Sequence, residues 1–229
     1  MSRGVFITGT DTGVGKTLVS ATLLVALNGG GWRAAGMKPV ASGCVETPAG
    51  WRNDDAVTLA AHSAGAPAYA LVNPYALPEA IAPHVAAAGH AIEIRLDPLV
   101  AAFATLSTNT DFVVIEGVGG WMVPLSGTLM QADLVRALRV PAVLVVGLRL
   151  GCINHALLSA RAIGADGIEL LGWIGNRVDP HMHSVDENIA ALNERMPAPC
   201  LGVLPYASAQ DRVALAAYLQ AAAMSIARL

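Results

Sequence analysis

Charged and aromatic residues are scarce in this chain of 229 residues. Asp, Glu, Lys and Arg together make up 14% of it and aromatic residues 5%, whereas apolar residues reach 54%. The formal net charge is −3, and Lys and Arg form no run. The sequence therefore lacks the basic patch that binds nucleic acid or an anionic membrane surface. We expect a small-molecule partner, no nucleic acid and no membrane, and the apolar excess favours a homo-oligomer.

Cysteine motifs and long apolar runs are also missing. The apolar segment 142–148 is far shorter than the ~20 residues that span a bilayer, and Arg149 ends it. The first residues show none of the layered regions of a signal peptide, so we expect a cytoplasmic protein. The cysteines are too few and too widely spaced for a disulfide framework, and we expect three reduced thiols: Cys44, Cys152 and Cys200.

Short apolar segments alternate with longer helix-like ones along the whole chain. This pattern predicts a single α/β domain over residues 1–229, with a mostly parallel sheet covered by helices on both faces. We predict strands at 5–8, 34–40, 112–116, 142–147, 170–176 and 201–204. We predict helices at 16–27, 54–62, 98–106, 131–138, 153–163, 184–195 and 210–226. The proline-rich stretch 67–83 should be an irregular surface loop near a site.

The first strand runs into a phosphate-binding loop, GTDTGVGKT at 9–17, and a helix pattern starts at its lysine. Glycines let backbone N–H groups curl around phosphate oxygens, Lys16 reaches the terminal phosphates, and Thr17 offers a hydroxyl to Mg²⁺. The spacing departs from the standard motif, because five residues rather than four separate Gly9 from Gly15. A chance Gly-Lys-Thr in a glycine-rich turn is the alternative, but strand, loop and helix coincide here. We therefore predict a nucleotide site in a P-loop NTPase fold.

Acidic residues offer candidate metal ligands. Glu116 ends a buried strand, where open α/β sheets bind their ligands, although a turn-capping role is also open to it. Asp54 and Asp55 open a helix pattern, where acids are favourable even without a functional role.

A base-binding segment follows a later strand. Asn176 and Arg177 begin a sequence shaped like the guanine-reading Asn-Lys-x-Asp signature, but with Arg in place of Lys. Guanine thus stays a minority alternative to adenine, and Asn176 could also be a buried turn residue.

Several segments, in order along nearly the whole chain, resemble the dethiobiotin synthetase family. The phosphate loop resembles the family's own, which also carries the extra residue. The other segments that carry the resemblance are GMKPVASG at 36–43, RNDDA at 52–56, VNPY at 72–75, EGVGGW at 116–121, LGCINHA at 150–156 and GWIGN at 172–176.

The resemblance implies a homodimeric ligase of biotin biosynthesis that uses ATP and Mg²⁺. Such an enzyme closes the ureido ring of dethiobiotin from 7,8-diaminononanoate and CO₂, through a carbamate and a carbamic-phosphoric anhydride. The resemblance assigns the phosphate and carbamate to Lys16 and Lys38, and the metal to Thr17, Asp55 and Glu116. It assigns ATP also to Gly13, Val14, Gly15, Gly117, Val118, Gly119, Asn176, Arg177, Pro205, Tyr206 and Ala207. It assigns the diamine end to Thr12 and Ser42, and the substrate carboxylate, across the dimer interface, to Gly151, Cys152, Ile153 and Asn154.

One departure and two rival classes accompany this interpretation. Gly13 stands where some family members carry a glutamate, which leaves nucleotide preference open. A partition-type or metallochaperone ATPase shares the fold, but would carry a second lysine early in the loop, absent between Gly9 and Gly15. A related cobalamin-pathway amidoligase would need a glutaminase domain, for which 229 residues leave no room.

Overall fold

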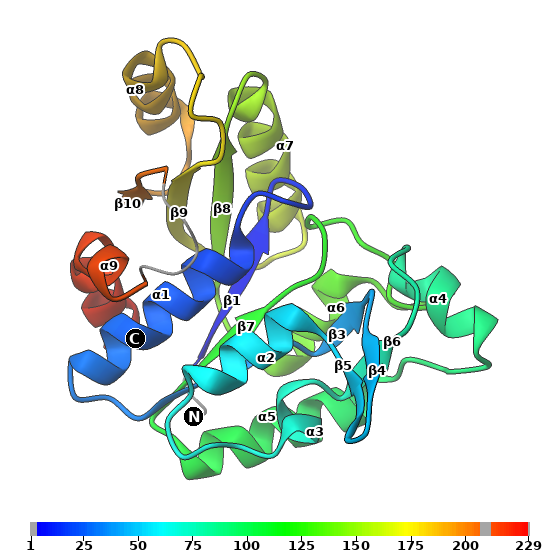
Figure 1. Ribbon diagram of the computed structural model, residues 1–229. Helices are drawn as coiled ribbons and strands as arrows, with labels where there is room; N and C mark the ends of the chain where they lie inside the picture. Colours follow the sequence, from blue (N-terminus) through cyan, green and yellow to red (C-terminus); the bar gives the residue numbers. More distant parts are fainter. Residues whose placement is uncertain (1–3, 207–211, 229) are drawn as a thin grey trace.

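The computed structural model describes residues 4–206 and 212–228, and its centre is a six-stranded parallel sheet (Figure 1). The strand order is β10-β9-β8-β1-β7-β2. These strands are β1 Gly4–Gly9, β2 Ala34–Met37, β7 Phe112–Glu116, β8 Ala142–Leu148, β9 Leu170–Arg177 and β10 Cys200–Leu204. The predicted fold class is confirmed, and each of the six predicted strands overlaps one of these.

Helices cover both faces of the sheet (Figure 1). One face packs against α1 Lys16–Gly29, α2 Asp54–Ala61 and α9 Arg212–Ile226. The other packs against α5 Leu96–Asn109, α6 Gln131–Leu138, α7 Cys152–Ala165 and α8 Val185–Arg195. Because successive strand side chains point to opposite faces, Val5 and Ile7 lie in the first core and Phe6 in the second. Both cores are therefore built from the same buried strands.

Small elements between β2 and α5 flank the carboxyl edge of the sheet. Strands β3 Val40–Ser42 and β6 Tyr75–Leu77 pair in parallel, and β4 Val45–Thr47 and β5 Gly50–Arg52 form an antiparallel hairpin. Two short helices, α3 Tyr69–Val72 and α4 Pro83–Gly89, complete the segment.

Two predictions for this region were wrong in detail. The predicted strand 34–40 ends at Met37, because Pro39 cannot donate to a ladder and the Lys38 N–H bonds the Val72 carbonyl, 2.7 Å away. The stretch 67–83 is not wholly irregular, because it contains α3, β6 and the first residue of α4. Its prolines lie at the borders of these three elements. Among the described residues, no helix is long and apolar enough to span a bilayer.

Candidate active site

The loop between β1 and α1 has the backbone geometry expected for phosphate binding. Gly15 precedes α1 in the left-handed conformation, with φ of 88°, and offers no side chain to cap the helix. The first N–H groups of α1 are therefore available to an anion. A Cβ at Gly15 would lie 2.0 Å from Asn176 Nδ2, so only glycine fits there. A hydrogen bond of 3.0 Å from the Thr10 N–H to the Val145 carbonyl ties the loop to β8.

Lys16, the first residue of α1, is buried beside this loop. Its ammonium donates to the Asp11 carbonyl at 3.0 Å. Burial lowers the pKa of Lys16 to about 8, with the nearby Lys38 adding to the effect. An anion binding here would restore the preference for the charged form. A phosphate bound at the loop would therefore stabilise the charged form of Lys16.

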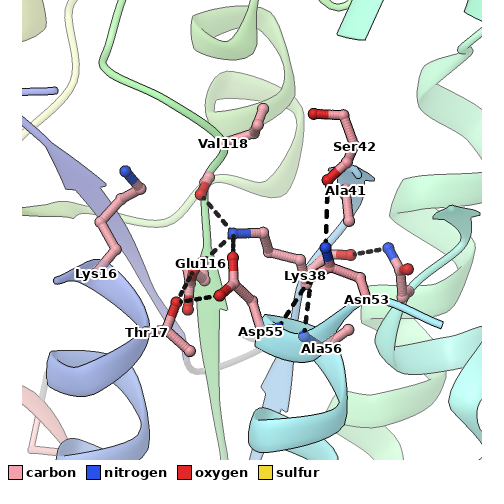
Figure 2. Close-up of polar contacts among 12 residues, drawn as sticks. Lys16, Thr17, Lys38, Ala41, Ser42, Asn53, Asp55, Ala56, Glu116 and Val118 are labelled. Carbon is pink, nitrogen blue, oxygen red and sulfur yellow. Dashed lines mark hydrogen bonds and ion pairs between the residues drawn. The ribbon is translucent and has the colours of Figure 1, made fainter. Parts of the chain in front are cut away.

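A second lysine, Lys38, directly follows β2 and lies between the carboxylates of Glu116, at the end of β7, and Asp55, in the first turn of α2 (Figure 2). Its Nζ is 2.6 Å from Glu116 Oε1, 2.8 Å from Asp55 Oδ2 and 3.3 Å from the Gly117 carbonyl oxygen. Thr17 Oγ1 lies 2.7 Å from Asp55 Oδ1 and 2.9 Å from Glu116 Oε1. These contacts join β2, β7, α1 and α2 in one polar cluster.

The cluster is buried, so its charges interact strongly with one another. The side chain of Lys38 is 4% exposed and that of Glu116 is 0% exposed. Burial opposes the charge on Lys38, but Glu116 and Asp55 outweigh it, so the pKa of Lys38 is raised. Burial likewise opposes the charge on Asp55, and Lys38 outweighs it and lowers the pKa of Asp55. Lys38 and Asp55 are therefore both ionised at neutral pH.

Asn53 orients the first turn of α2, which carries Asp55 toward the cluster. Its side-chain oxygen caps α2, accepting from the Asp55 and Ala56 N–H groups, and its amide donates to the Ser42 carbonyl at 3.3 Å. Asp54 points to solvent, as an ordinary first-turn acid does, whereas Asp55 faces Thr17 and Lys38. The adjacent acids therefore have different environments.

A cleft of about 760 Å³ opens above these groups. The structure brings together many of the predicted site residues in its walls: Thr12, Gly13, Gly15, Lys16, Thr17, Lys38, Ser42, Asp55, Glu116, Val118 and Gly119. Gly120, in the glycine-rich turn after Glu116, also lines the cleft. The sequence alone assigns no site role to the remaining lining residues: Asn53, Ala80, Ile81, Ala82, Pro83, Val123 and Pro124. For residues 80–83 the signal in the sequence is the proline-rich stretch 67–83, which predicts a loop near a site but not which residues line it.

Other predicted site residues do not line this cleft. Val14, Gly117 and Asn176 are buried, and Asn176 Nδ2 donates to the Val14 carbonyl at 3.0 Å. Arg177, Pro205 and Tyr206 lie at or beyond the ends of β9 and β10, while Ala207 falls outside the described residues. Gly151, Cys152, Ile153 and Asn154 form the start of α7, away from the cleft walls.

Comparison with known proteins places these features in a family. A family model described as "AAA domain" matches residues 3–213. The ATP-dependent dethiobiotin synthetase BioD of Xanthomonas euvesicatoria is 56% identical over 215 residues, covering 94% of this chain and 96% of that protein. The protein of the same name from Xylella fastidiosa is 58% identical over 201 residues, covering 88% and 89%.

Solved structures agree on the fold alone. MinD of Pyrococcus horikoshii, complexed with Mg-ADP, aligns over 99% of this chain and 96% of its own, with a TM-score of 0.57 and 18% identity. FtsY of Thermotoga maritima aligns over 96% and 69%, with a TM-score of 0.53 and 16% identity. The identity to these proteins is low, whereas the identity to the synthetases exceeds half of the aligned residues. The chain therefore belongs to the family of ATP-dependent dethiobiotin synthetases, enzymes of biotin biosynthesis.

Proposed function

We propose that this chain closes the ureido ring of dethiobiotin from 7,8-diaminononanoate, CO₂ and ATP, with release of ADP and phosphate. The observation that carries the proposal is the pair of buried lysines in one cleft, Lys16 at the phosphate loop and Lys38 between Asp55 and Glu116. The printed name of the relatives supports the same reaction.

The reaction balances in three steps. One substrate amine adds to CO₂ and loses a proton, which gives a carbamate. A carbamate oxygen then attacks the γ-phosphorus of ATP, and ADP leaves. The second amine attacks the carbamoyl carbon of the mixed anhydride and loses a proton, phosphate leaves, and a five-membered cyclic urea remains.

The two ammonium groups suit the second step. Two anions, the carbamate and the γ-phosphate, must approach each other, so cations facing them stabilise the transition state. Lys16, at the N-terminus of α1, would contact the phosphates. Lys38, on the β2 side of the cleft, would contact the carbamate oxygen. Both groups are buried, which strengthens such interactions relative to water.

The residues at the centre of the cluster fit a magnesium ion. Asp55, Glu116 and Thr17 supply oxygen atoms, the ligands that Mg²⁺ prefers, and Glu116 Oε2 is buried with no hydrogen-bond partner among the described residues. In the described part of the chain, no three His, Cys, Asp or Glu side chains form a metal cluster. The proposal thus rests on two carboxylates and a hydroxyl, with water and phosphate completing the shell, as is usual for Mg²⁺. When bound, the ion would neutralise charge on the phosphates.

Asn176 favours adenine over guanine. Because the Val14 carbonyl can only accept, it fixes the Asn176 amide nitrogen toward itself and leaves the side-chain oxygen for a ligand. An acceptor suits the exocyclic amine of adenine and not the carbonyl of guanine. Gly13, Val14, Gly15, Gly117, Val118, Gly119, Arg177, Pro205, Tyr206 and Ala207 remain proposed nucleotide contacts.

The cleft also offers an apolar surface for the rest of the substrate. Ile81, Pro83, Val123 and Pro124 line the cleft, and an alkyl chain can cover them. Thr12 and Ser42 provide hydroxyl groups within the same cleft for the diamine end.

The carboxylate end of the substrate would reach a second subunit. Gly151, Cys152, Ile153 and Asn154 open α7, whose first N–H groups can bind a carboxylate, but they do not line the cleft of their own chain. Leu150, just before them, is 95% exposed, as expected for a residue that a partner covers. We therefore propose a homodimer with shared sites.

ADP release tests the proposed reaction directly. With ATP, Mg²⁺ and bicarbonate, we expect release to depend on 7,8-diaminononanoate and to match the dethiobiotin formed, one for one. A monoamine analogue is the control, because it can form a carbamate but cannot close the ring. ADP release that does not change on adding the diamine would contradict the assignment.

Lys38→Gln should act on chemistry more than on nucleotide binding. Loss of a transition-state cation costs about 3–4 kcal/mol, so we expect kcat/KM for the diamine to fall by roughly 10²–10³ while the ATP dissociation constant changes much less. Lys16→Gln is the matched control and should impair both quantities. A Lys38→Gln enzyme within roughly threefold of wild type would place its ammonium outside the reacting centre.

Sedimentation velocity should show a dimer at assay concentration. Leu150→Glu should shift the equilibrium toward monomer and lower the activity, because a charge would be buried without a partner in the interface. Val213→Glu is the control, since Val213 on α9 is 78% exposed and is not assigned to the interface. A fully active wild-type monomer refutes the shared site.

A further inference from the structure

A carboxylate stands in the phosphate loop, where the anionic ligand of the proposed function would bind. Asp11 lies five residues before Lys16, and its side chain is 51% exposed. An anion near a triphosphate weakens binding unless a cation neutralises it. The residue that does so here is Arg149, whose Nη2 lies 2.7 Å from Asp11 Oδ2.

Asp11 organises the tip of the loop through three contacts. Its Oδ1 accepts from the Thr12 N–H at 2.7 Å, its Oδ2 accepts from Arg149, and its backbone carbonyl accepts from Lys16 Nζ at 3.0 Å. Gly13, next in the loop, is exposed, and a Cβ there would meet nothing within 4 Å. Packing therefore constrains the tip weakly at this point, and the ion pair supplies a fixed contact.

Arg149 is attached to a second functional turn. It follows Leu148, the last residue of β8, and its carbonyl accepts from the Cys152 N–H at 3.0 Å, at the first residue of α7. Strands β1 and β8 are neighbours in the sheet, so the loop after β1 and the turn after β8 meet at one edge (Figure 1). The ion pair links the loop proposed for phosphate to the helix start proposed for the substrate carboxylate.

The pair is too exposed to matter much for the stability of the fold. Its side chains are 42% and 51% exposed, and pairs of this kind contribute little to the free energy of unfolding. The pair can still matter for the reaction rate through the position of nearby groups. A small displacement of groups that bind reacting atoms lowers the rate much more than it lowers the stability of the fold.

We propose that the Asp11–Arg149 ion pair is a positioning device for phosphoryl transfer. It holds the tip of the phosphate loop against the turn that opens α7, and so fixes where Lys16 and the loop N–H groups meet the nucleotide. The inference rests on the proposed function for its kinetic consequence, but its effect on nucleotide binding needs no diamine.

Asp11→Asn separates positioning from simple electrostatics, because the two explanations predict opposite changes in the affinity for nucleotide. The amide keeps an oxygen for the Thr12 N–H but removes a negative charge near the phosphates, so electrostatics alone predicts tighter binding of a fluorescent ADP analogue. Positioning predicts weaker binding and a fall in kcat/KM for ATP, each about tenfold. Arg149→Gln should lower the nucleotide affinity and kcat/KM for ATP as much as Asp11→Asn does. The double variant should lose no more than either single variant, because both remove the same ion pair. Arg149→Lys, which keeps the positive charge, should lose less than Arg149→Gln.

The control breaks an ion pair outside the cleft. Arg136→Gln removes the contact to Asp166, which is 3.1 Å long and joins α6 to the end of α7, and should leave ADP binding unchanged. Unfolding midpoints of the Asp11 and Arg149 variants should stay near wild type. Asp11→Asn binding ADP as tightly as wild type, or losses that add in the double variant, overturns the inference. Absence of diamine-dependent turnover with the binding effects intact would instead count against the proposed function.

Discussion

The buried ammonium of Lys38 between Glu116 and Asp55 is the interaction on which the rest of the site depends. Charges taken out of water are tolerated only when paired, so the ends of β2, β7 and α2 must meet at one point. Thr17 adds the start of α1 to the same point. The residues that could hold phosphate, metal and carbamate are thus brought together by charge compensation at the carboxyl edge of the sheet.

Around this cluster, the cleft is built from the phosphate loop and from short elements that follow β2. The phosphate loop is fixed by β1, by the close approach of Asn176 to Gly15, and by the ion pair from Asp11 to the β8–α7 turn. Other lining residues, 80–83, come from the short elements between β2 and α5. In α/β enzymes, loops at the carboxyl edge of the sheet commonly carry the binding residues.

The sequence was most informative where one periodicity or one motif decides the structure. Strands buried on both faces have continuous apolar sequences, and the phosphate loop and Glu116 follow from spacing and a strand end. The role of Lys38 was predicted from the family resemblance. The hairpin β4–β5, the pair β3–β6 and helices α3 and α4 were missed, because short, half-exposed elements show no clear period. Asn176 was predicted to contact the base, but its hydrogen bond to Val14 depends on a tertiary contact across 162 residues. Residues of the cleft wall such as Ile81 carry no chemical signal in sequence.

Asp55 and Glu116 form a site that requires a cation, and the Lys38 ammonium pairs with both carboxylates in this structure. The most direct measurement is the free energy of unfolding of Lys38→Met in urea, with and without Mg²⁺ and without nucleotide. Removing the ammonium leaves the two carboxylates without their paired cation, so the variant should be less stable than wild type. Mg²⁺ should stabilise it by at least about 1 kcal/mol more than it stabilises wild type. Lys16→Met loses the same charge without a bond to either carboxylate, and should show the wild-type response. Equal stabilisation of wild type, Lys38→Met and Lys16→Met by Mg²⁺ would show that Asp55 and Glu116 do not depend on the Lys38 ammonium for charge compensation.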